Sequence, residues 1–321
     1  MSTESYDLTK SKNNKMHWQK VKQLFSPDKN YDWMWSHAAN PVPYILDENK
    51  EIVRVFFTCR TEKNNSHIGY VDINFLNNYK IINISSKTVL APGQIGTFDD
   101  SGTAMGCFVE KDSEIYLFYL GWNLKVTVPW LNTIGLAKAN SINDEFIKYS
   151  MAPIMDRSHQ DPFSISYPSI LFDDGKYKMW YGSNLAWGKD QSEMQHVIKY
   201  AESIDLINWT RTNQIHIPLV HKNEYALSKP WVIKTNDGFK MWYSYRGNNA
   251  IETYRIGYAQ SPDGIIWQRM DKDVGIDVAT DGWDSEMISY PSVFILNSKT
   301  YMLYNGNGYG KTGFGLAILN N

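Results

Sequence analysis

Short apolar runs that end in an aromatic residue recur along the chain at an almost constant spacing. The runs read VFF, LFY, MWY, MWY and MLY, and they end at Phe57, Tyr119, Tyr181, Tyr243 and Tyr304. Successive ends lie 62, 62, 62 and 61 residues apart. A fixed period of short, strand-like segments is the signature of a repeat architecture, so we interpret the chain as five copies of one unit.

Each unit contains two further apolar segments, one before the aromatic run and one after it. Proline marks the earlier segment in four units, as NPV, YPS, KPW and YPS, whereas the second unit has GTA at this place. The later segments read IGYV, IGLA, IKYA, IGYA and FGLA. Turn residues separate the first segment from the second, as in DDGK at 173–176 and NDG at 236–238. The pattern therefore predicts antiparallel strands joined by tight hairpins.

A fourth strand with a tryptophan follows in units three and four, around Trp209 and Trp267, but unit five stops before one. The sequence HWQK at 17–20 repeats this fourth-strand pattern, so we expect an N-terminal strand to complete the fifth sheet and close a ring. This predicts an all-β, five-bladed β-propeller with four-stranded antiparallel blades in a single domain, residues 1–321. A β-sandwich with coincidental spacing is the alternative.

The expected boundaries follow from the repeat. The outer strand of blade 5 is expected at 15–25, and blades 1 to 5 at about 37–85, 99–150, 161–212, 224–270 and 284–319. The recurring tryptophans at strand positions, which we expect to lie in the core, are Trp180, Trp242, Trp209 and Trp267.

Composition narrows the class of protein. With 43% hydrophobic and 21% charged residues the chain can bury a core, and a mean hydropathy of −0.43 is unlike that of a membrane protein. A formal net charge of −2 supplies no basic field, so we expect neither nucleic-acid binding nor membrane insertion. The N-terminal residues contain no apolar signal-peptide core, which favours a cytoplasmic protein. The pattern does not predict an oligomeric state.

The chain shows no signature of a metal or cofactor site. Cys59 and Cys107 are too few for a disulfide framework and lack zinc-ligand spacing, so both are expected to be buried thiols. No P-loop, dinucleotide fingerprint or metalloprotease motif is present, and no cofactor or metal is expected.

Two sets of residues are expected to meet at one face of the ring, where loops enter the first strands and leave the second strands. The residues that follow the aromatic runs are Arg60, Trp122, Asn184, Arg246 and Asn307. The polar residues that approach the first strands are His37, Asp99, Asp100, Glu224 and Glu286, with Asp161 and Asp284 further out. Long loops in units two to four carry Trp122, Trp130 and Trp187, which serve either as sugar-stacking platforms or in loop packing.

These residues suggest two kinds of chemistry. Glycoside hydrolysis uses two carboxyl groups across the scissile bond, and the candidates are Asp99, Asp100, Glu286 and Glu224. Turn capping, a hydrogen bond to a loop amide and surface exposure are the structural alternatives for these side chains. The basic groups would suit a phosphate, a sugar phosphate, a nucleotide sugar or an acidic sugar, and they are Arg60, Arg246, His37 and Lys229.

With five repeats and proline-marked inner strands, the chain resembles the propeller glycosidases of families 43, 32 and 68 and the mannoside phosphorylases of family 130. The segments FDDSG, GWN, YGSN, SYRG, GWDSEM and YNGNGYGKTGFG look like uncharacterised bacterial propellers and the N-terminal propeller region of plant glucosamine inositolphosphorylceramide transferases. The bacterial relatives often accompany surface-polysaccharide genes. The resemblance thus implies a carbohydrate ligand without naming a reaction.

The chain departs from the glycosidase pattern at three places. Where families 43 and 32 place carboxylates, this sequence has Asn40 before Pro41, Tyr167 before Pro168 and Ser228-Lys229 before Pro230. The usual catalytic triad therefore does not transfer. We expect an enzyme of the propeller glycosidase type that acts on a charged sugar or sugar phosphate in surface-polysaccharide metabolism. The alternatives are a non-catalytic propeller that binds glycans or nucleotide sugars, and a phosphorylase or transferase with an Arg/His anion site.

Overall fold

The five aromatic runs form the second strands of five antiparallel sheets. The computed structural model describes residues 15–187, 194–247 and 252–320. The second strands are β3 (Ile52–Arg60), β7 (Glu114–Leu124), β11 (Lys176–Ala186), β15 (Gly238–Arg246) and β19 (Lys299–Asn305). The nearly continuous burial of β3, β7 and β11 fits strands that are covered on both faces.

The other strands flank these in the same order in every blade. The first strands are β2 (Ser36–Asp47), β6 (Gly102–Lys111), β10 (Ile165–Asp173), β14 (Ala226–Thr235) and β18 (Ser289–Leu296). The third strands are β4 (Ser66–Asn74), β8 (Trp130–Ala139), β12 (Gln195–Ser203), β16 (Arg255–Ser261) and β20 (Phe314–Leu319). The fourth strands are β5 (Lys80–Ile84), β9 (Ile147–Lys148), β13 (Thr210–Arg211), β17 (Gln268–Arg269) and β1 (Trp18–Phe25). Two short helical turns, η1 (Asp271–Asp273) and α1 (Asn307–Gly310), lie between strands.

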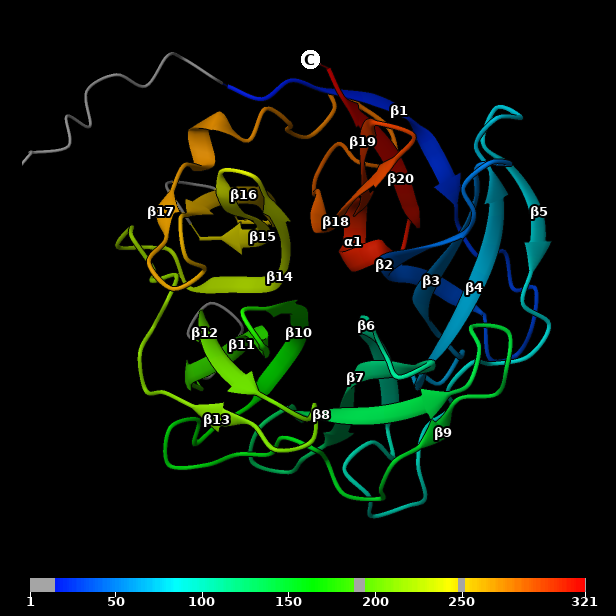
Figure 1. Ribbon diagram of the computed structural model, residues 1–321. Coiled ribbons are helices and arrows are strands. Elements are labelled where there is room, and N and C mark those ends of the chain that lie inside the picture. The colour runs from blue at the N-terminus through cyan, green and yellow to red at the C-terminus, as the bar shows by residue number, and fades with distance from the viewer. Residues whose placement is uncertain (1–14, 188–193, 248–251, 321) are drawn as a thin grey trace, which may run out of the picture.

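The N-terminal strand closes the ring. β1 pairs antiparallel with β20, with Trp18 opposite Leu319 and Phe25 opposite Phe314, in a sheet of order β1-β20-β19-β18. Figure 1 shows these two ends of the chain side by side in the circle of sheets. The predicted all-β propeller and its closure by an N-terminal strand are confirmed, and closure leaves the ring with few unpaired strand edges.

The tryptophans of the fourth strands pack between neighbouring blades. Each touches, edge to face, the central aromatic of the second strand in the preceding blade. The pairs are Trp209 with Phe118, Trp267 with Trp180 and Trp18 with Trp242, with ring centroids 5.9, 5.9 and 6.2 Å apart. Trp180 and Trp242 are buried, as predicted for the core, whereas Trp209 and Trp267 are half-buried and pack against the core. Both cysteines are free and buried as expected.

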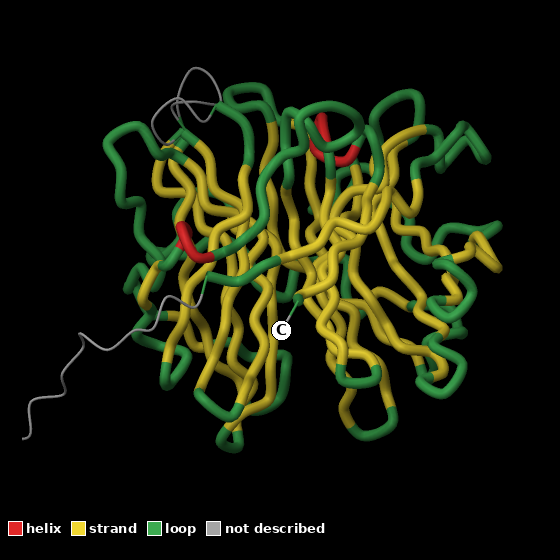
Figure 2. The backbone as a smooth tube through the Cα atoms, turned by 90° about the horizontal axis from the view of Figure 1, so that it is seen from above, coloured by secondary structure: helices red, strands yellow, loops and turns green. Residues whose placement is uncertain are grey.

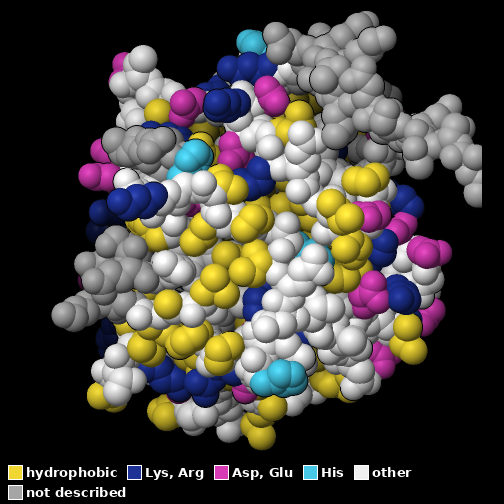
Figure 3. All heavy atoms as spheres, turned by 90° about the vertical axis from the view of Figure 1, so that its left-hand side faces the viewer, with side chains coloured by type: hydrophobic (Ala, Val, Ile, Leu, Met, Phe, Trp, Pro, Cys, Tyr) yellow, Lys and Arg dark blue, Asp and Glu magenta, His cyan; other side chains and the backbone are white. Residues whose placement is uncertain are grey.

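Loops cover both ends of the sheets, as the side view in Figure 2 shows. Around the rim of blades 3 and 4, Figure 3 shows hydrophobic side chains interspersed with basic and acidic ones. Ile204 and Ile266 are 77% and 70% exposed. Apolar side chains scattered in this way are ordinary surface features.

Candidate functional site

A pocket of about 390 Å³ opens at the end of the ring where the second strands finish, and all five blades contribute to its wall. We call it the mouth pocket. Its described lining consists of Ala39, Asn40, Thr58, Arg60, Asn64, Ser66, Ala104, Leu120, Trp122, Leu124, Trp130, Asn132, Ser166, Tyr167, Met194, His196, Ser228, Arg246, Tyr254, Tyr290 and Tyr309. This described lining contains arginine, histidine, amide and tyrosine side chains but no Asp or Glu.

The residues before the inner-strand prolines adopt a left-handed backbone conformation. Their φ angles are +53° at Asn40, +45° at Tyr167, +51° at Lys229 and +53° at Tyr290, and a shift in strand register occurs at each. Such a conformation is strained for a residue other than glycine, and a bulge redirects the side chain. Three of these four residues line the mouth pocket, so the repeated bulge is the device that aims them there.

Arg246 supplies a buried guanidinium to the pocket. It is only 6% exposed and lies against the rings of Tyr225, Tyr254 and Tyr309, with 4.9, 4.7 and 5.7 Å between its central carbon and the ring centroids. Its Nη1 also donates a hydrogen bond to the Tyr309 hydroxyl at 2.6 Å. These contacts hold the planar group in one orientation, the condition for recognising a carboxylate or phosphate.

Arg60 supplies a second guanidinium from blade 1. It is half-buried, and its Nη1 donates to Asn64 Oδ1 at 2.9 Å. The predicted pair of arginines therefore does meet in one pocket. Two guanidiniums in one pocket favour an anionic ligand.

Two histidines accompany the arginines. Burial, reinforced by the charge of Arg246, lowers the pKa of His196 to about 4. Burial, followed by the charges of Arg60 and Lys311, likewise lowers the pKa of His37 to about 4. Both imidazoles are therefore neutral near pH 7. His196 lines the mouth pocket, whereas His37 lies outside that lining with its Nδ1 2.9 Å from the Ser36 hydroxyl.

Lys229 is fully buried and does not line the mouth pocket. Its Nζ donates to the Gly106 carbonyl at 3.3 Å and lies 4.9 Å from the Trp231 ring centroid. Burial lowers the pKa of this ammonium to about 8. Lys229 therefore adds positive charge near the inner strands without a direct contact to a ligand in the pocket.

Tryptophans form the wall of the pocket on the blade 2 side. Trp122 and Trp130 both line it, and Trp122 Nε1 donates to the Ser66 hydroxyl at 2.7 Å. Trp187 packs edge-on against Trp130, with ring centroids 5.5 Å apart. The structure thus brings together two candidate platforms and supports one of them with Trp187.

Asp99 and Glu224 lie in buried ion pairs outside the mouth lining. Asp99 is 1% exposed, and its Oδ2 accepts from Tyr119 at 2.9 Å and from Lys148 Nζ at 2.7 Å. Both carboxylate oxygens of Glu224 accept from Arg269, at 2.9 and 2.8 Å. The same Tyr–Asp–cation arrangement recurs with Asp161 in blade 3 and Asp284 in blade 5. It ties a fourth-strand cation to the second strand of its blade.

Asp100 and Glu286 also lie outside the described lining of the mouth pocket. Asp100 accepts from the Gly96 amide at 3.0 Å and the Ser101 hydroxyl at 2.9 Å, which shapes its own loop. Glu286 is exposed, and its main-chain amide donates to Asn307 Oδ1 at 2.8 Å. Asn307 thus organises this loop. Asn184 is 3% exposed and lies opposite His196 in the sheet, and neither asparagine is part of the described lining. The four carboxylates do not meet in the described lining of one pocket, and their catalytic roles remain predictions.

Several lining residues were not among the sequence candidates. A signal existed for Asn40, Tyr167 and Tyr290, because they occupy one repeated place before the inner-strand prolines. His196 precedes the third apolar segment of its unit, a place that the repeat does not mark. Tyr309 lies in a turn that only unit five contains, so the repeat offers no guide to it.

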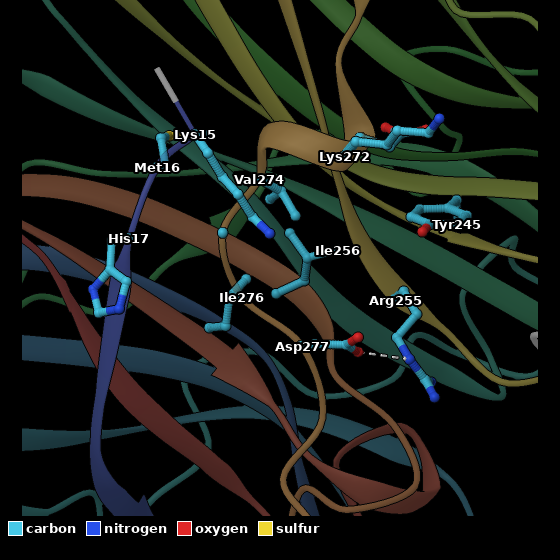
Figure 4. A pocket seen from close by; sticks show the side chains of 12 residues that line it. Lys15, Met16, His17, Tyr245, Arg255, Ile256, Lys272, Val274, Ile276 and Asp277 are labelled. Carbon is cyan, nitrogen blue, oxygen red and sulfur yellow. Dashed lines mark ion pairs between the residues drawn. The ribbon is translucent and has the colours of Figure 1, made fainter. Parts of the chain in front are cut away.

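A second cleft, of about 670 Å³, lies where β1 joins the ring beside η1 (Figure 4). Its charged residues include Arg255 and Asp277, which pair at 3.0 Å, and its floor includes the core residues Ile256 and Val274. Backbone bonds from Met16 and Trp18 build this junction. We take the cleft as a consequence of ring closure.

Neither a metal site nor a membrane span is found in the described ranges. No group of three or more His, Cys, Asp or Glu side chains lies close enough there to hold a metal ion. None of the helices in the same ranges is long and apolar enough to cross a membrane.

Comparison with solved structures places this fold among the propellers that glycoside hydrolases use. One glycoside hydrolase aligns with a TM-score of 0.72 and 13% identity, over 95% of this chain and 91% of that one. A structure from the family 130 mannoside phosphorylases, described as containing hydrolases that target β-1,2 mannosidic linkages in Candida mannan, aligns with a TM-score of 0.72 and 16% identity. That alignment covers 94% of this chain and 93% of the other. These similarities show the fold alone.

Sequence comparison identifies a much nearer relative. The chain is 43% identical over 306 residues to the uncharacterized protein Rv1502 of Mycobacterium tuberculosis, across 95% of this chain and 100% of that protein. The chain belongs to the same family as Rv1502. No protein-family model matches it.

Proposed function

We propose that this protein is a carbohydrate-active propeller whose mouth pocket binds an acidic sugar, carrying a carboxylate or a phosphate, and acts on its glycosidic bond. The observation that supports this most strongly is the pairing of Arg60 and Arg246 in a described lining without Asp or Glu. The planar donors of both guanidiniums match the oxygens of a carboxylate or a phosphate on such a sugar.

The shape and chemistry of the wall favour a sugar as the carrier of that anion. Trp122 and Trp130 present indole faces, while Asn40, Asn132 and Ser228 present small hydrogen-bonding groups. Aromatic faces for stacking and a few placed polar groups are what a sugar ring requires. The structural neighbours that act on glycans also favour a sugar ligand. A role in surface-polysaccharide metabolism accords with this chemistry.

Titration calorimetry with matched ligands tests the proposal. Uronate oligosaccharides and sugar phosphates are compared with the corresponding neutral sugars at low and at high salt. We expect the anionic ligands to bind more tightly and to lose affinity as salt screens the arginines. Comparing the carboxylate with the phosphate series identifies the anion. Equal affinity for charged and neutral ligands would contradict the proposal.

Arginine variants provide the second arm. Arg60→Met and Arg246→Met keep the aliphatic stem but remove the charge, and each should weaken binding by about 1.5 to 3 kcal/mol, the usual contribution of a charged hydrogen bond. Arg157→Met, at an exposed arginine outside the lining, serves as the matched control. Unchanged affinity in both pocket variants would exclude an arginine-based anion site.

A further inference from the structure

The mouth pocket contains the groups needed to cleave a glycosidic bond beside a carboxylate without using water. We propose that the protein is a lyase that cleaves 4-linked uronate glycans by β-elimination, with Arg246 holding the uronate carboxylate, His196 removing the proton from C5 and Tyr309 protonating the departing oxygen. This proposal rests on the acidic-sugar function above and specifies its reaction.

The described lining of the mouth pocket contains the types of group that elimination uses. The described lining holds two arginines, a histidine and four tyrosines. Elimination needs a cation at the substrate carboxylate, a base and an acid, which are groups of these types.

The three proposed residues come from consecutive blades. His196 on β12 lies opposite Ala226 on β14, and Ala226 in turn lies opposite Arg246 on β15. Tyr309 in blade 5 accepts the hydrogen bond from Arg246 Nη1 at 2.6 Å. Around the mouth, Arg246 in blade 4 therefore lies between the proposed base, His196 in blade 3, and the proposed acid, Tyr309 in blade 5.

Arg246 makes the C5 proton acidic enough to remove. Removing this proton places negative charge on the adjacent carboxylate, and a guanidinium bound there stabilises that charge. Arg246 is 6% exposed and held among tyrosine rings, so its field acts in a region of low dielectric and needs little reorganisation.

His196 can accept the proton because it is neutral. Burial and Arg246 keep its pKa at about 4 in the unliganded protein. A carboxylate bound at Arg246 offsets that repulsion and raises the proton affinity of the imidazole. The substrate thus strengthens the base that acts on it, because Arg246 is a charged group that acts on this imidazole.

Tyr309 is suited to give a proton. Its oxygen accepts from Arg246, which leaves its own O–H to point elsewhere in the pocket that it lines. The same guanidinium stabilises the phenolate that remains after the proton has left. Its φ of +59° in α1 is a strained conformation for tyrosine, as is common for residues held in place for function.

The step balances without water or a redox partner. The C5–H bond breaks and its proton passes to His196, while the electron pair is delocalised onto the substrate carboxylate. This pair then forms the C4=C5 double bond as the C4–O bond breaks, and the oxygen leaves with the Tyr309 proton as the hydroxyl of the neighbouring sugar. Proton return from imidazolium to phenolate through solvent restores the protein.

A second, independent observation points to a polar ligand in the same pocket. Asn40 is 2% exposed, lines the pocket and carries a buried Oδ1 without a hydrogen-bond partner among the described residues. A buried acceptor of this kind costs stability unless a ligand satisfies it. A sugar hydroxyl beside Arg60 would do so.

The experiment uses the full-length protein with sodium polygalacturonate, alginate and hyaluronan, three glycans that contain 4-linked uronates. Cleavage is followed by the ultraviolet absorbance of the conjugated 4,5-unsaturated uronate and by mass spectrometry. We expect an unsaturated product that is one water lighter than a hydrolysis product. Saturated fragments, or calorimetric binding of these glycans without cleavage, overturn the lyase while leaving the acidic-sugar function intact. No binding of any of the three overturns the lyase and the carboxylate form of the acidic-sugar function, and binding of sugar phosphates in the calorimetry then decides the phosphate form.

Variants separate chemistry from folding. His196→Gln and Tyr309→Phe should each slow elimination by at least about a hundredfold, the usual contribution of a general base or acid, with affinity changed less than about threefold. His159→Gln, at an exposed histidine outside the pocket, should retain full activity. In heavy water, His196→Gln should also lose exchange of the C5 hydrogen, whereas Tyr309→Phe should keep it. A merely structural role would instead lower both affinity and melting temperature.

Discussion

Replacing Asp99 with Asn should destabilise the protein while leaving glycan binding intact. Asp99 accepts hydrogen bonds from Tyr119, Lys148 and Thr97 at 2.9, 2.7 and 3.0 Å. Asparagine keeps the size of the side chain and can still accept from Tyr119. It removes the charge that balances the Lys148 ammonium.

The size of the effect follows from burial. The Asp99 side chain is 2% exposed and that of Lys148 is 25% exposed. Breaking a fully buried pair by removing one partner costs about 3 to 5 kcal/mol, and the partial exposure of Lys148 lowers this to about 2 to 4 kcal/mol. At about 2 °C per kcal/mol for a chain of this length, the melting temperature should fall by about 4 to 8 °C.

Urea unfolding monitored by tryptophan fluorescence measures this loss, and calorimetry with the uronate oligosaccharides measures binding. The double variant Asp99→Asn with Lys148→Met should recover part of the lost stability, because no uncompensated charge remains. A variant that unfolds normally but no longer binds or cleaves the glycan would refute the reasoning and return Asp99 to a catalytic role.

Two further predictions concern a titrating group and a blade junction. Burial and Arg246 hold the pKa of His196 at about 4, below its value of 6.5 in an unfolded chain, so the unfolded state binds the proton more tightly and the stability of the fold should decrease as the pH drops from about 6.5 to 4. Over that range the urea midpoint of His196→Gln should decline less than that of the unmodified protein, and an equal decline would contradict the assignment. Trp267→Ala removes the edge contact with Trp180 across the blade 3–4 junction and should lower the free energy of unfolding in urea by about 2 to 3 kcal/mol, which is less than the loss expected for a fully buried tryptophan. Ile266→Ala, at the neighbouring exposed position, should change that free energy by under about 0.5 kcal/mol.

The strands could be predicted because each depends on local features that recur five times. The aromatic runs, the hairpin turns and the fourth-strand tryptophans all lie within one unit, and even the closing strand repeats a pattern seen elsewhere in the chain. The ion pairs could not be predicted in this way, because their partners lie far apart in the sequence. Asp99 and Lys148, for example, are 49 residues apart. One regularity did point to their structural role: Asp99, Asp161 and Asp284 each precede the tyrosine that they bind by 20 residues.

The site was harder to predict because it depends on differences among equivalent positions. The bulge before the inner-strand proline gives Asn40, Tyr167, Lys229 and Tyr290 nearly the same backbone conformation, yet these are an amide, two phenols and an ammonium. Packing requires the blades to be alike, whereas a pocket on the axis of a ring needs a different group from each blade. The chemistry of the mouth pocket therefore comes from the residues that break the repeat, and these are the positions at which substitutions should alter ligand choice with the least effect on the fold.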